Sequence, residues 1–294
     1  MIYLVDASVF VFRAWFSLPD SMTDPEGRPI NAVYGFAGFL GEFLRRVGPG
    51  HMAVAFDESL TTSFRNEIYP DYKANRELPP PELEYQFELC RELTGLMGVA
   101  QFADSRYEAD DIIGTISARM RSAGRNSVIV TRDKDLAQLI RPGDEFWNYV
   151  DKRRFRYQDV QEGFGALPER MPDYQALVGD SVDNIPGVPG VGPKTAAALM
   201  REFESLEALF DDLDAVARLP LRGARGVAKR LAEHREAAFL ARRLTRIATD
   251  MPLSVEPGKL VRVRPDLDRL FGFYDRLGLG QRLRREAQQI AEVQ

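Results

Sequence analysis

Nine of the 44 acidic residues of this chain lie in five short clusters, most of which end an apolar run. The clusters hold nine carboxylates: Asp6; Asp57; Glu108, Asp110 and Asp111; Asp133 and Asp135; Asp180 and Asp183. An acid at the end of a buried strand normally costs stability, because a buried charge needs a partner. Repeated placement of this kind predicts that the acids surround something positive, and divalent metal ions are the obvious candidates.

Alternating strand and helix patterns predict an α/β fold. Apolar runs predict strands at 2–5, 52–56 and 127–131, and helical spacing predicts helices at 31–47, 82–98, 109–122 and 134–140. This alternation is typical of a parallel sheet with helices on both faces. In such sheets the functional crevice lies beyond the carboxyl ends of the strands, where Asp6, Asp57 and Asp133 fall.

Strand signals fade after about residue 172. Residues 173–246 have the pattern of short helices joined by Gly/Pro turns, and residues 266–294 predict one or two further helices. We therefore expect two domains, 1–172 and 173–294. The single cysteine, Cys90, excludes an internal disulfide and fits a reducing compartment. Since no signal peptide or membrane-spanning stretch is evident, the expected location is cytoplasmic.

The acid spacing fits a magnesium site. Magnesium prefers oxygen ligands, and two such ions about 4 Å apart can assist phosphodiester cleavage. Glu108 and Asp111 are three residues apart at a helix start and share a face. For any single acid, a role as helix cap or dipole partner stays open. The two histidines, His51 and His234, do not pair, so neither a zinc site nor a Ser-His-acid arrangement is predicted.

Residues 64–76 interleave cations with aromatic rings, a pattern that can hold phosphates while rings stack on bases. The residues concerned are Arg65, Lys73 and Arg76 with Tyr69 and Tyr72. The alternative is a solvated basic loop. Beside a metal cluster, these cations are candidates for neutralising a scissile phosphate.

Residues 185–199 contain two glycine-rich turns before a helix that is expected to begin near Pro193. Backbone N–H groups at such a helix start can hold a phosphate, with Lys194 and Thr195 as added donors. Val188 occupies the position where the phosphate loop of nucleotide hydrolases requires glycine, so that motif is excluded. A plain helix-turn-helix connection remains the alternative. Downstream, residues 218–246 form a locally basic stretch in a chain of net charge -5.

Several motifs occur together in a recognisable order: VDAS, AFD, FRNEIYPDYKANR, YEADD, TRDKDLAQL and GDSVDNIPGVPGVGPKTA. Together they resemble the bacterial 5′–3′ exonuclease and flap endonuclease family, which includes the N-terminal nuclease domain of DNA polymerase I. The resemblance runs from residue 1 to about residue 250. It implies a PIN-like α/β nuclease core, a helical arch at about 62–90 and a helix-3-turn-helix DNA-binding region.

The resemblance also implies roles for individual residues. It implies two metal groups, one of Asp6, Asp57, Glu108 and Asp110, and one of Asp133, Asp135, Asp180 and Asp183. Asp111 is a further candidate ligand beside the first group. It implies that Lys73 and Arg76 are catalytic cations at the base of the arch and that Tyr72 stacks on a base. The implied duplex contacts are Gly190, Gly192, Lys194 and Thr195, with a potassium ion at the hairpin, and Arg65 joins the DNA-binding set.

The resulting hypothesis is a structure-specific nuclease that cleaves DNA near single-strand/duplex junctions by two-metal-ion hydrolysis. Its cofactor is Mg²⁺, for which Mn²⁺ substitutes, and its partner is DNA with a 5′ flap, nick or overhang. We expect a monomer with no membrane association, and both replication and repair fit. A PIN-type ribonuclease shares the acids but has no need of the glycine hairpins. A non-catalytic junction-binding protein explains the basic regions but not the acids.

Overall fold

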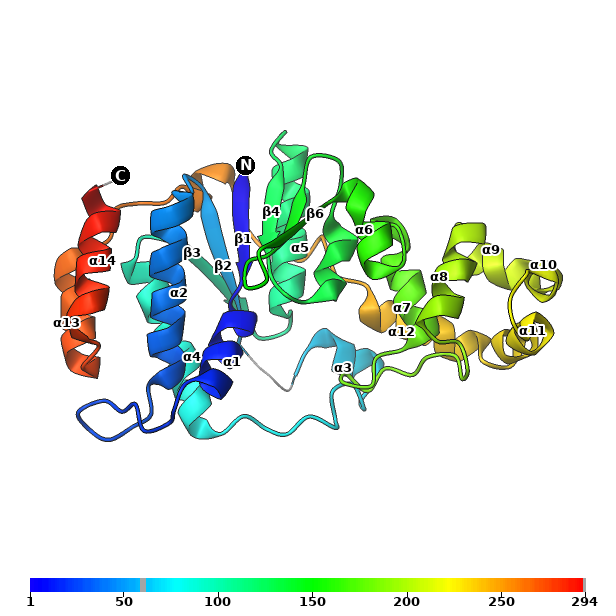
Figure 1. The fold of residues 1–294 in the computed structure, drawn as a ribbon, viewed down its shortest axis with the longest axis horizontal. Coiled ribbons are helices and arrows are strands. Elements are labelled where there is room, and N and C mark those ends of the chain that lie inside the picture. The colour runs from blue at the N-terminus through cyan, green and yellow to red at the C-terminus, as the bar shows by residue number, and fades with distance from the viewer. Residues whose placement is uncertain (59–61, 293–294) are drawn as a thin grey trace. The chain divides into compact units, whose positions relative to one another are not determined.

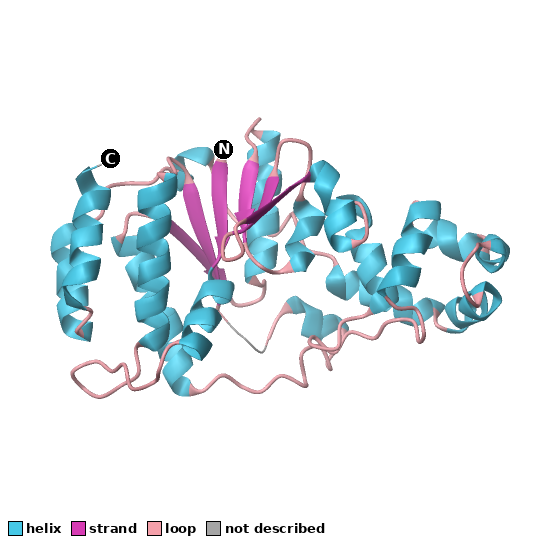
Figure 2. Ribbon diagram, in the orientation of Figure 1, coloured by secondary structure: helices cyan, strands magenta, loops and turns pink. Residues whose placement is uncertain are grey.

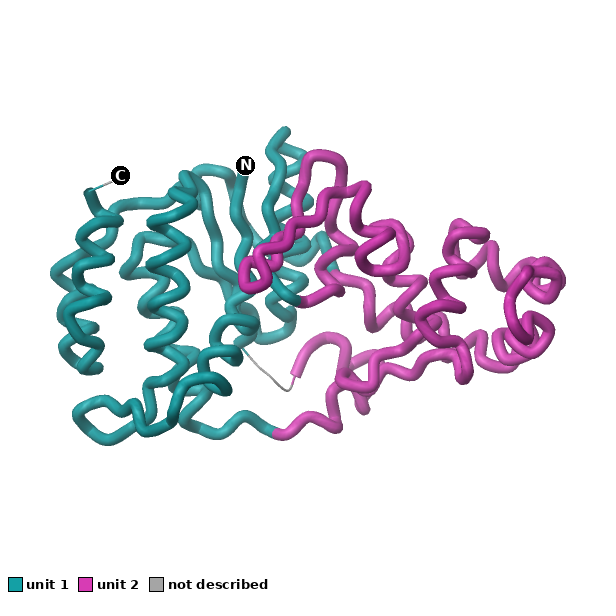
Figure 3. The backbone as a smooth tube through the Cα atoms, in the orientation of Figure 1, with its two compact units in different colours: residues 1–60, 78–132, 248–294 teal, residues 61–77, 133–247 magenta. Residues whose placement is uncertain are grey.

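The computed structural model describes residues 1–58 and 62–292, which form two compact units (Figure 3). Unit 1 comprises residues 1–60, 78–132 and 248–294, and unit 2 comprises residues 61–77 and 133–247. Each unit is therefore assembled from segments that are distant in the chain. This division differs from the expected boundary at residue 172, because the chain after residue 248 belongs to unit 1.

Unit 1 is an α/β layer structure (Figure 1). Its strands are β1 (Ile2–Asp6), β2 (Met52–Asp57), β3 (Ala100–Asp104) and β4 (Ser127–Val130). Its helices are α1 (Ala7–Ser17), α2 (Asn31–Val47), α4 (Pro81–Leu96), α5 (Ala109–Ser122), η3 (Pro257–Leu260), α13 (Leu267–Leu277) and α14 (Gly280–Glu292).

The strands of unit 1 lie in the order β3-β2-β1-β4, and all three pairings are parallel. Every residue of β4 is buried, as is all of β2 except Asp57. Continuous burial means that helices cover both faces of these strands, as expected for a parallel sheet. The register aligns Asp6 of β1 with Ala55 of β2, so the two strands end at the same edge of the sheet.

The C-terminal segment completes unit 1 against helices from the first hundred residues. Helix α14 packs on α2, and α13 packs on α4 (Figure 1). The approach to α13 is close, because the amide of Val263 donates to the carbonyl of Gly98 at 3.0 Å. A Cβ atom at Gly98 would lie 2.0 Å from the carbonyl oxygen of Val263, so only glycine fits there.

Unit 2 is mainly helical (Figure 2). Its elements are α3 (Phe64–Ile68), η1 (Lys134–Leu139), β5 (Glu145–Asn148), β6 (Arg153–Arg156), α6 (Tyr157–Phe164), η2 (Pro168–Arg170), α7 (Met171–Val178), α8 (Pro193–Glu202), α9 (Leu206–Asp211), α10 (Leu213–Arg218), α11 (Ala224–Glu233) and α12 (Arg235–Thr245). Strands β5 and β6 form an antiparallel hairpin.

The core of unit 2 joins its two chain segments. Apolar side chains of α7, α8, α9, α11 and α12 pack in one cluster, and Tyr72 from the earlier segment belongs to the same cluster. Burial of these side chains stabilises the unit by roughly 1.5–3 kcal/mol per large residue. Residues 62–77 are therefore anchored to the rest of unit 2 by the packing of Tyr72.

The predicted α/β class with a helical C-terminal region is confirmed, and so are most of the predicted elements. Helices 31–47 and 109–122 occur with the predicted bounds. The pattern missed β3 and the β5–β6 hairpin, and the stretch expected as helix 134–140 is a 3₁₀ helix. Among residues 1–58 and 62–292, no helix combines the length and apolarity needed to cross a membrane.

Candidate functional site

Asp6 ends β1 and is 4% exposed. Its Oδ1 atom accepts a 3.1 Å hydrogen bond from the amide of Ser8 and thereby caps α1. Its Oδ2 atom accepts a 2.9 Å hydrogen bond from the hydroxyl of Thr131, the residue after β4. Asp6 therefore links the carboxyl ends of two neighbouring strands, which stabilises a buried charge by hydrogen bonding.

Asp57 ends β2, and its carboxylate accepts hydrogen bonds from the first turn of α1 and from the start of α5. Its Oδ2 atom accepts a 2.6 Å hydrogen bond from the hydroxyl of Ser8. Its Oδ1 atom accepts a 2.8 Å hydrogen bond from the amide of Ala109, the first residue of α5. Through Ser8 and Ala109, hydrogen bonds connect Asp6, Asp57 and the start of α5.

The start of α5 places three acids in different environments. Glu108 is the N-cap and forms a capping box with Asp111, whose Oδ2 atom accepts from the Glu108 amide at 3.1 Å. The Oδ1 atom of Asp111 accepts from the amide of Ala248 at 2.8 Å, and the residue is fully buried. Both Asp111 oxygens thus hold backbone amides, a structural cap role. Asp110 and Glu108 keep partial exposure.

Unit 2 carries the other four acids. Asp133 caps η1 through a 2.9 Å hydrogen bond from the amide of Asp135. Desolvation by the surrounding protein raises the pKa of Asp133 although part of its surface meets solvent, and the negative charge of Asp183 adds to the shift. Desolvation also raises the pKa of Asp135 well above its ordinary value, and Asp133, Asp180 and Asp183 contribute in the same direction. The charge of Asp183 thus acts on both Asp133 and Asp135 in the same direction as burial.

Asp180 and Asp183 lie in a tight loop after α7. The Oδ1 atom of Asp180 accepts from the amides of Val182 at 2.8 Å and Asp183 at 3.3 Å. Its Oδ2 atom lies 3.7 Å from Nζ of Lys134. The Asp183 carboxylate pairs with Arg76 and accepts from the Tyr72 hydroxyl at 3.4 Å. The loop itself is closed by paired backbone hydrogen bonds between Asp180 and Ile185.

The donor chemistry of both groups fits a hard divalent cation, since every candidate donor is a carboxylate oxygen. Burial is the main cause of the raised pKa values of Asp133 and Asp135, and a bound cation would favour their ionised forms. Across residues 1–58 and 62–292, however, no three His, Cys, Asp or Glu side chains already converge as a ligand set. Their oxygens are instead engaged by Ser8, Thr131, Arg76 and backbone amides. The ligand assignments therefore stay predictions.

Lys73 and Arg76 lie beside the unit 2 acids. Arg76 pairs directly with Asp183. Lys73 adopts a left-handed backbone (φ 59°), and its amide donates to the carbonyl of Asp183 at 2.9 Å. The charge of Lys73 acts to lower the pKa of Asp133, against the larger effect of desolvation. The structure thus brings both predicted catalytic cations to the acids at 133–183.

Tyr72 is not placed for stacking on a base. Its ring is 4% exposed and packs in the unit 2 core, with Nζ of Lys73 5.0 Å from the ring centroid. A buried ring offers no free face to a nucleobase. Its hydroxyl contacts Asp183, so the structure favours a role in orienting that carboxylate.

Arg65 is likewise not available to DNA in this structure, contrary to the predicted DNA-binding role. It is 2% exposed, and its guanidinium donates to the carbonyls of Leu244 at 2.7 Å and Arg246 at 3.2 Å. These carbonyls lie at the C-terminus of α12, where a cation also meets the negative end of the helix dipole. Arg65 is therefore a buried helix cap.

The segment expected to form a helical arch, about 62–90, is not one element. Only Phe64–Ile68 is helical before a run of turns, and α4 begins at Pro81. The first turns of α4 contribute Leu83, Phe87 and Cys90 to the core of unit 1. Residues 69–80 are therefore the part that connects the two anchored ends.

The glycine hairpin precedes α8 as predicted. Gly190 has a left-handed φ of 73°, so the local backbone itself favours glycine there. Gly192 is different, because an added Cβ would meet no other described atom within 4 Å. Gly192 and Lys194 are exposed at the helix start, and Thr195 is partly exposed. No described side chain caps α8, so its N-terminus suits an anion.

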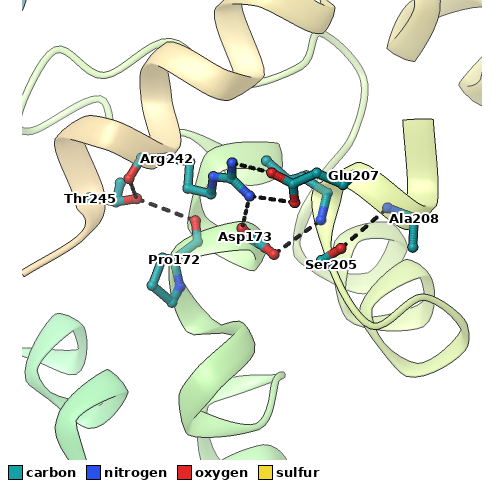
Figure 4. Close-up of polar contacts among 8 residues, drawn as sticks. Pro172, Asp173, Ser205, Glu207, Ala208, Arg242 and Thr245 are labelled. Carbon is teal, nitrogen blue, oxygen red and sulfur yellow. Dashed lines mark hydrogen bonds and ion pairs between the residues drawn. The ribbon is translucent and has the colours of Figure 1, made fainter. Parts of the chain in front are cut away.

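The basic stretch 218–246 serves partly as scaffold. Arg242 pairs with Asp173 of α7 and with Glu207 of α9, and so joins three helices (Figure 4). Asp173 also accepts from the amide of Leu206 at 3.0 Å. Hydrogen bonds from Arg242 lower the pKa of Glu207 to about 2, whereas burial raises the pKa of Asp173. Several other cations of the stretch, including Arg222, Arg225 and Lys229, are exposed.

The sequence patterns did not single out four residues that organise the acids. Ser8 and Thr131 orient Asp6 and Asp57. Asn75 and Asn184 join the turn at 71–76 to the loop at 180–184 in unit 2. Ser8 lies two positions after Asp6, and an aspartate side chain commonly accepts a hydrogen bond from the backbone amide at this spacing. This local pattern could have indicated the contact between the two residues. The contacts of Thr131, Asn75 and Asn184 span more than a hundred residues, so no local pattern could reveal them.

Two family models match nearly the whole chain. The model described as "5′-3′ exonuclease, N-terminal resolvase-like domain" matches residues 1–165, and "5′-3′ exonuclease, C-terminal SAM fold" matches residues 166–268. DNA polymerase I of Rhizobium leguminosarum is 39% identical over 92% of this chain and 27% of its own length. DNA polymerase I of Pseudomonas aeruginosa is 40% identical over 93% of this chain and 30% of its own. The chain thus spans less than a third of either relative.

Solved structures share the fold at low identity. T5 5′-exonuclease with bound divalent metal ions (zinc) has a TM-score of 0.66 and 20% identity, covering 99% of this chain and 98% of that one. The catalytic core of Rad2 in complex with DNA substrate has a TM-score of 0.64 and 16% identity, covering 98% of this chain and 90% of that one. Both likenesses support the α/β core with a helical C-terminal region.

Proposed function

This chain belongs to the 5′-3′ exonuclease family, and from that premise we propose that it is a structure-specific nuclease. It hydrolyses DNA phosphodiesters near junctions between single strand and duplex, as an exonuclease and flap endonuclease. The proposed role is in DNA replication or repair, and its support is the similarity to relatives named DNA polymerase I. The chain acts on DNA with a 5′ flap, nick or overhang, as a monomer in the cytoplasm.

The acids of the two units are the proposed metal ligands. Asp6, Asp57, Glu108 and Asp110 would hold one divalent ion, and Asp133, Asp135, Asp180 and Asp183 would hold another. Asp111 is left out, because both its oxygens hold backbone amides. When bound, such ions activate water and stabilise negative charge on the phosphate. Mg²⁺ is the proposed ion, with Mn²⁺ as its substitute. T5 5′-exonuclease, a similar fold with bound divalent metal ions (zinc), supports a divalent ion in general.

Lys73 and Arg76 supply positive charge beside the unit 2 acids. Arg76 is 42% exposed, so its guanidinium can meet a solvent-borne phosphate. Cations held in place stabilise the charge that develops on a phosphodiester during cleavage. In this proposal the two side chains bind and orient the scissile phosphate, and Tyr72 holds Asp183 in position from below the surface.

The glycine hairpin holds the duplex. The uncapped N-terminus of α8 offers backbone donors, and Lys194 adds a mobile cation. No described neighbour of Gly192 would clash with a larger side chain, so packing does not explain the glycine. In this proposal, glycine at 192 leaves the backbone N–H groups accessible to a phosphate. A potassium ion bound at this hairpin would strengthen the same contact. These features favour DNA over the alternative PIN-type ribonuclease, which has no need of them.

The concentration of negative charge in unit 2 is the observation that carries the proposal. Asp183 pairs with Arg76, and Oδ2 of Asp180 lies 3.7 Å from Nζ of Lys134. In the same unit, burial raises the pKa values of Asp133 and Asp135, and the charge of Asp183 adds to both shifts. A folded protein keeps such a costly group where a bound cation or substrate makes use of it. A non-catalytic junction-binding protein would gain nothing from these acids.

The test is a cleavage assay on four 5′-labelled DNA substrates: a flap, a nick, an overhang and a single strand. The proposal expects cleavage near the junction with Mg²⁺ or Mn²⁺ and none with a chelator. A matched RNA flap separates the ribonuclease alternative, because the proposal expects DNA to be cut faster. Binding of the flap without cleavage in either metal would overturn the enzymatic assignment.

A further inference from the structure

Two loops of unit 2 that lie more than a hundred residues apart in the sequence are joined by hydrogen bonds. One is the turn at 71–76, which carries Lys73 and Arg76, and the other is the loop at 180–184, which carries two acids. The side-chain amide of Asn184 donates to the carbonyl of Asp71 at 2.7 Å, and that of Asn75 donates to the carbonyl of Ser181 at 2.8 Å. Each loop thus contributes one asparagine that binds the backbone of the other.

The conformation of Asn184 fits this contact. Its φ is 55°, in the left-handed region where asparagine is tolerated better than most residues. This turn aims the side chain at Asp71, and the preceding residue, Asp183, accepts from the Lys73 amide at 2.9 Å. Lys73 is itself left-handed, with φ 59°. Each of the two loops therefore holds one residue in the left-handed region beside the hydrogen bonds that join the loops.

We propose that Asn75 and Asn184 are positioning residues that hold Lys73 and Arg76 in register with the acids of the 180–184 loop. The inference rests on the proposed nuclease function, for which it identifies the elements that align the cations. Neither amide touches the charged groups, so both act through the backbone. Without the two asparagine amides, the turn at 71–76 would keep the hydrogen bond of the Lys73 amide and the contact of the flexible Arg76 side chain. It would lose the hydrogen bonds that Asn75 and Asn184 make between the two loops.

A purely structural role predicts something different. Both amide hydrogen bonds are exposed to solvent, and exposed hydrogen bonds contribute little net stability. The apolar core of unit 2, including Tyr72, anchors the same segment independently. Loss of either amide should therefore leave global folding intact while it loosens the turn. Misplacement of a catalytic group by a fraction of an ångström is costly in rate.

The experiment compares Asn184→Gly, Asn75→Ala and the double variant with wild type. Glycine at 184 permits the left-handed backbone and removes only the donor. The matched control is Asn148→Ala at the end of β5 in unit 2, which removes two solvent-exposed side-chain hydrogen bonds to Asp151 and so matches the double variant in number. Single-turnover cleavage of a 5′-flap DNA with Mg²⁺ and hydrogen exchange at the Lys73 amide are both measured.

We expect each single variant to lower the cleavage rate about tenfold with flap affinity changed less than about threefold, since tenfold corresponds to one ordinary hydrogen bond. Exchange at the Lys73 amide should quicken by a similar factor in metal-free protein. Asn148→Ala should change neither. In a Lys73→Ala, Arg76→Ala background, Asn184→Gly should cost little more, because the groups that it positions are gone.

Equal rates for wild type and the double variant, or an unchanged cost of Asn184→Gly without the two cations, would overturn the inference. If wild type does not cleave the flap, but the Lys73 amide still exchanges faster in the variants than in wild type, the result counts against the proposed function and not against the positioning role. The exchange measurement does not depend on cleavage, so the two failures are distinguishable. A fall in melting temperature that accounts for the rate loss would also contradict a positioning role.

Discussion

The hydroxyl of Ser8 donates a 2.6 Å hydrogen bond to Oδ2 of Asp57, while the amide of Ser8 donates to Oδ1 of Asp6. One residue at the start of α1 therefore orients two acids that end neighbouring parallel strands. Outer residues of this kind fix the direction of metal-binding carboxylates. Ser8 is thus part of the proposed metal site, although it would not bind the ion itself.

Ser8→Ala should weaken metal binding about tenfold, as loss of an outer-shell partner usually does. Titration of Mn²⁺ against metal-free protein, followed by electron paramagnetic resonance, measures this directly. Ser17→Ala is the control, because the Ser17 hydroxyl bonds only to the carbonyl of Arg13 within the same helix, as far as the described residues show. Equal affinities of the two variants would show that Ser8 does not organise the unit 1 acids.

Asp133→Asn should separate activity from stability. The cleavage rate should fall about 1,000-fold or more, because a proposed ligand of the divalent ion that stabilises charge on the phosphate is lost. In metal-free protein at pH 7, the same change should raise the free energy of unfolding. The pKa of Asp133 is raised, so its ionised form is disfavoured in the fold, and asparagine removes that cost.

Urea unfolding without metal and single-turnover cleavage with Mg²⁺ check both halves of this prediction. Asp151→Asn is a suitable control, since Asp151 lies in the exposed β5–β6 turn. Wild-type cleavage by Asp133→Asn would remove this residue from the proposed ligands. Lower stability of that variant would show that the acid is structurally required.

Arg65→Ala should destabilise the protein without a direct effect on DNA recognition. The substitution leaves the carbonyls of Leu244 and Arg246 without their charged donor in a buried place, which costs about 3 kcal/mol. Arg222→Ala, at an exposed position, should change the free energy of unfolding by less than about 0.5 kcal/mol. Denaturant unfolding of both variants is the measurement. A stable Arg65→Ala protein with weakened DNA binding would restore the DNA-contact role.

Glu207→Gln should alter the response of stability to acid. The folded-state pKa of Glu207 is lowered to about 2 from 4.5, so its ion pair with Arg242 stabilises the fold above pH about 4.5. That contribution is lost as pH falls from about 4.5 towards 2. Because the Glu207 side chain is 52% exposed, we expect only about 1 kcal/mol at pH 7.

The difference in unfolding free energy between wild type and Glu207→Gln should therefore shrink as pH falls and vanish near pH 2. Asp173 contributes with the opposite sign, because its raised pKa makes protonation favour the fold. Asp173 is present in both proteins, so it cancels in the comparison to a first approximation. Chemical unfolding at pH 7, 5 and 3 gives the curve. A difference that grows in acid would contradict the ion-pair assignment.

Strong local periodicity explains which elements were predictable. Helix α2 repeats large apolar residues at helical spacing, and it occurs with the predicted bounds. Strand β3, AQFAD, is short, lacks β-branched residues and is only partly buried, so nothing in its pattern marks it as a strand. The β5–β6 hairpin carries Arg153, Arg154 and Arg156 on one short strand, which likewise hides the strand signal.

The same distinction between local patterns and long-range packing applies to the residues of the candidate site. The acids were found because each follows a recognisable strand or loop motif in the sequence. Arg65 and Tyr72 lie in the same basic segment as Lys73 and Arg76, and composition cannot tell the four apart. Packing separates them, since Arg65 caps α12 and Tyr72 enters the unit 2 core while Arg76 stays exposed.

The sequence by itself determined the α/β class, the acids that end the strands and the family of the chain. These properties depend on residue spacing within a single segment and on motif order. Only the tertiary structure decided that residues 248–294 return to unit 1, that Arg65 is a buried cap, and that Asn75 and Asn184 join two loops. Burial and long-range hydrogen bonds arise between segments a hundred or more residues apart, and no local pattern encodes which segments will meet.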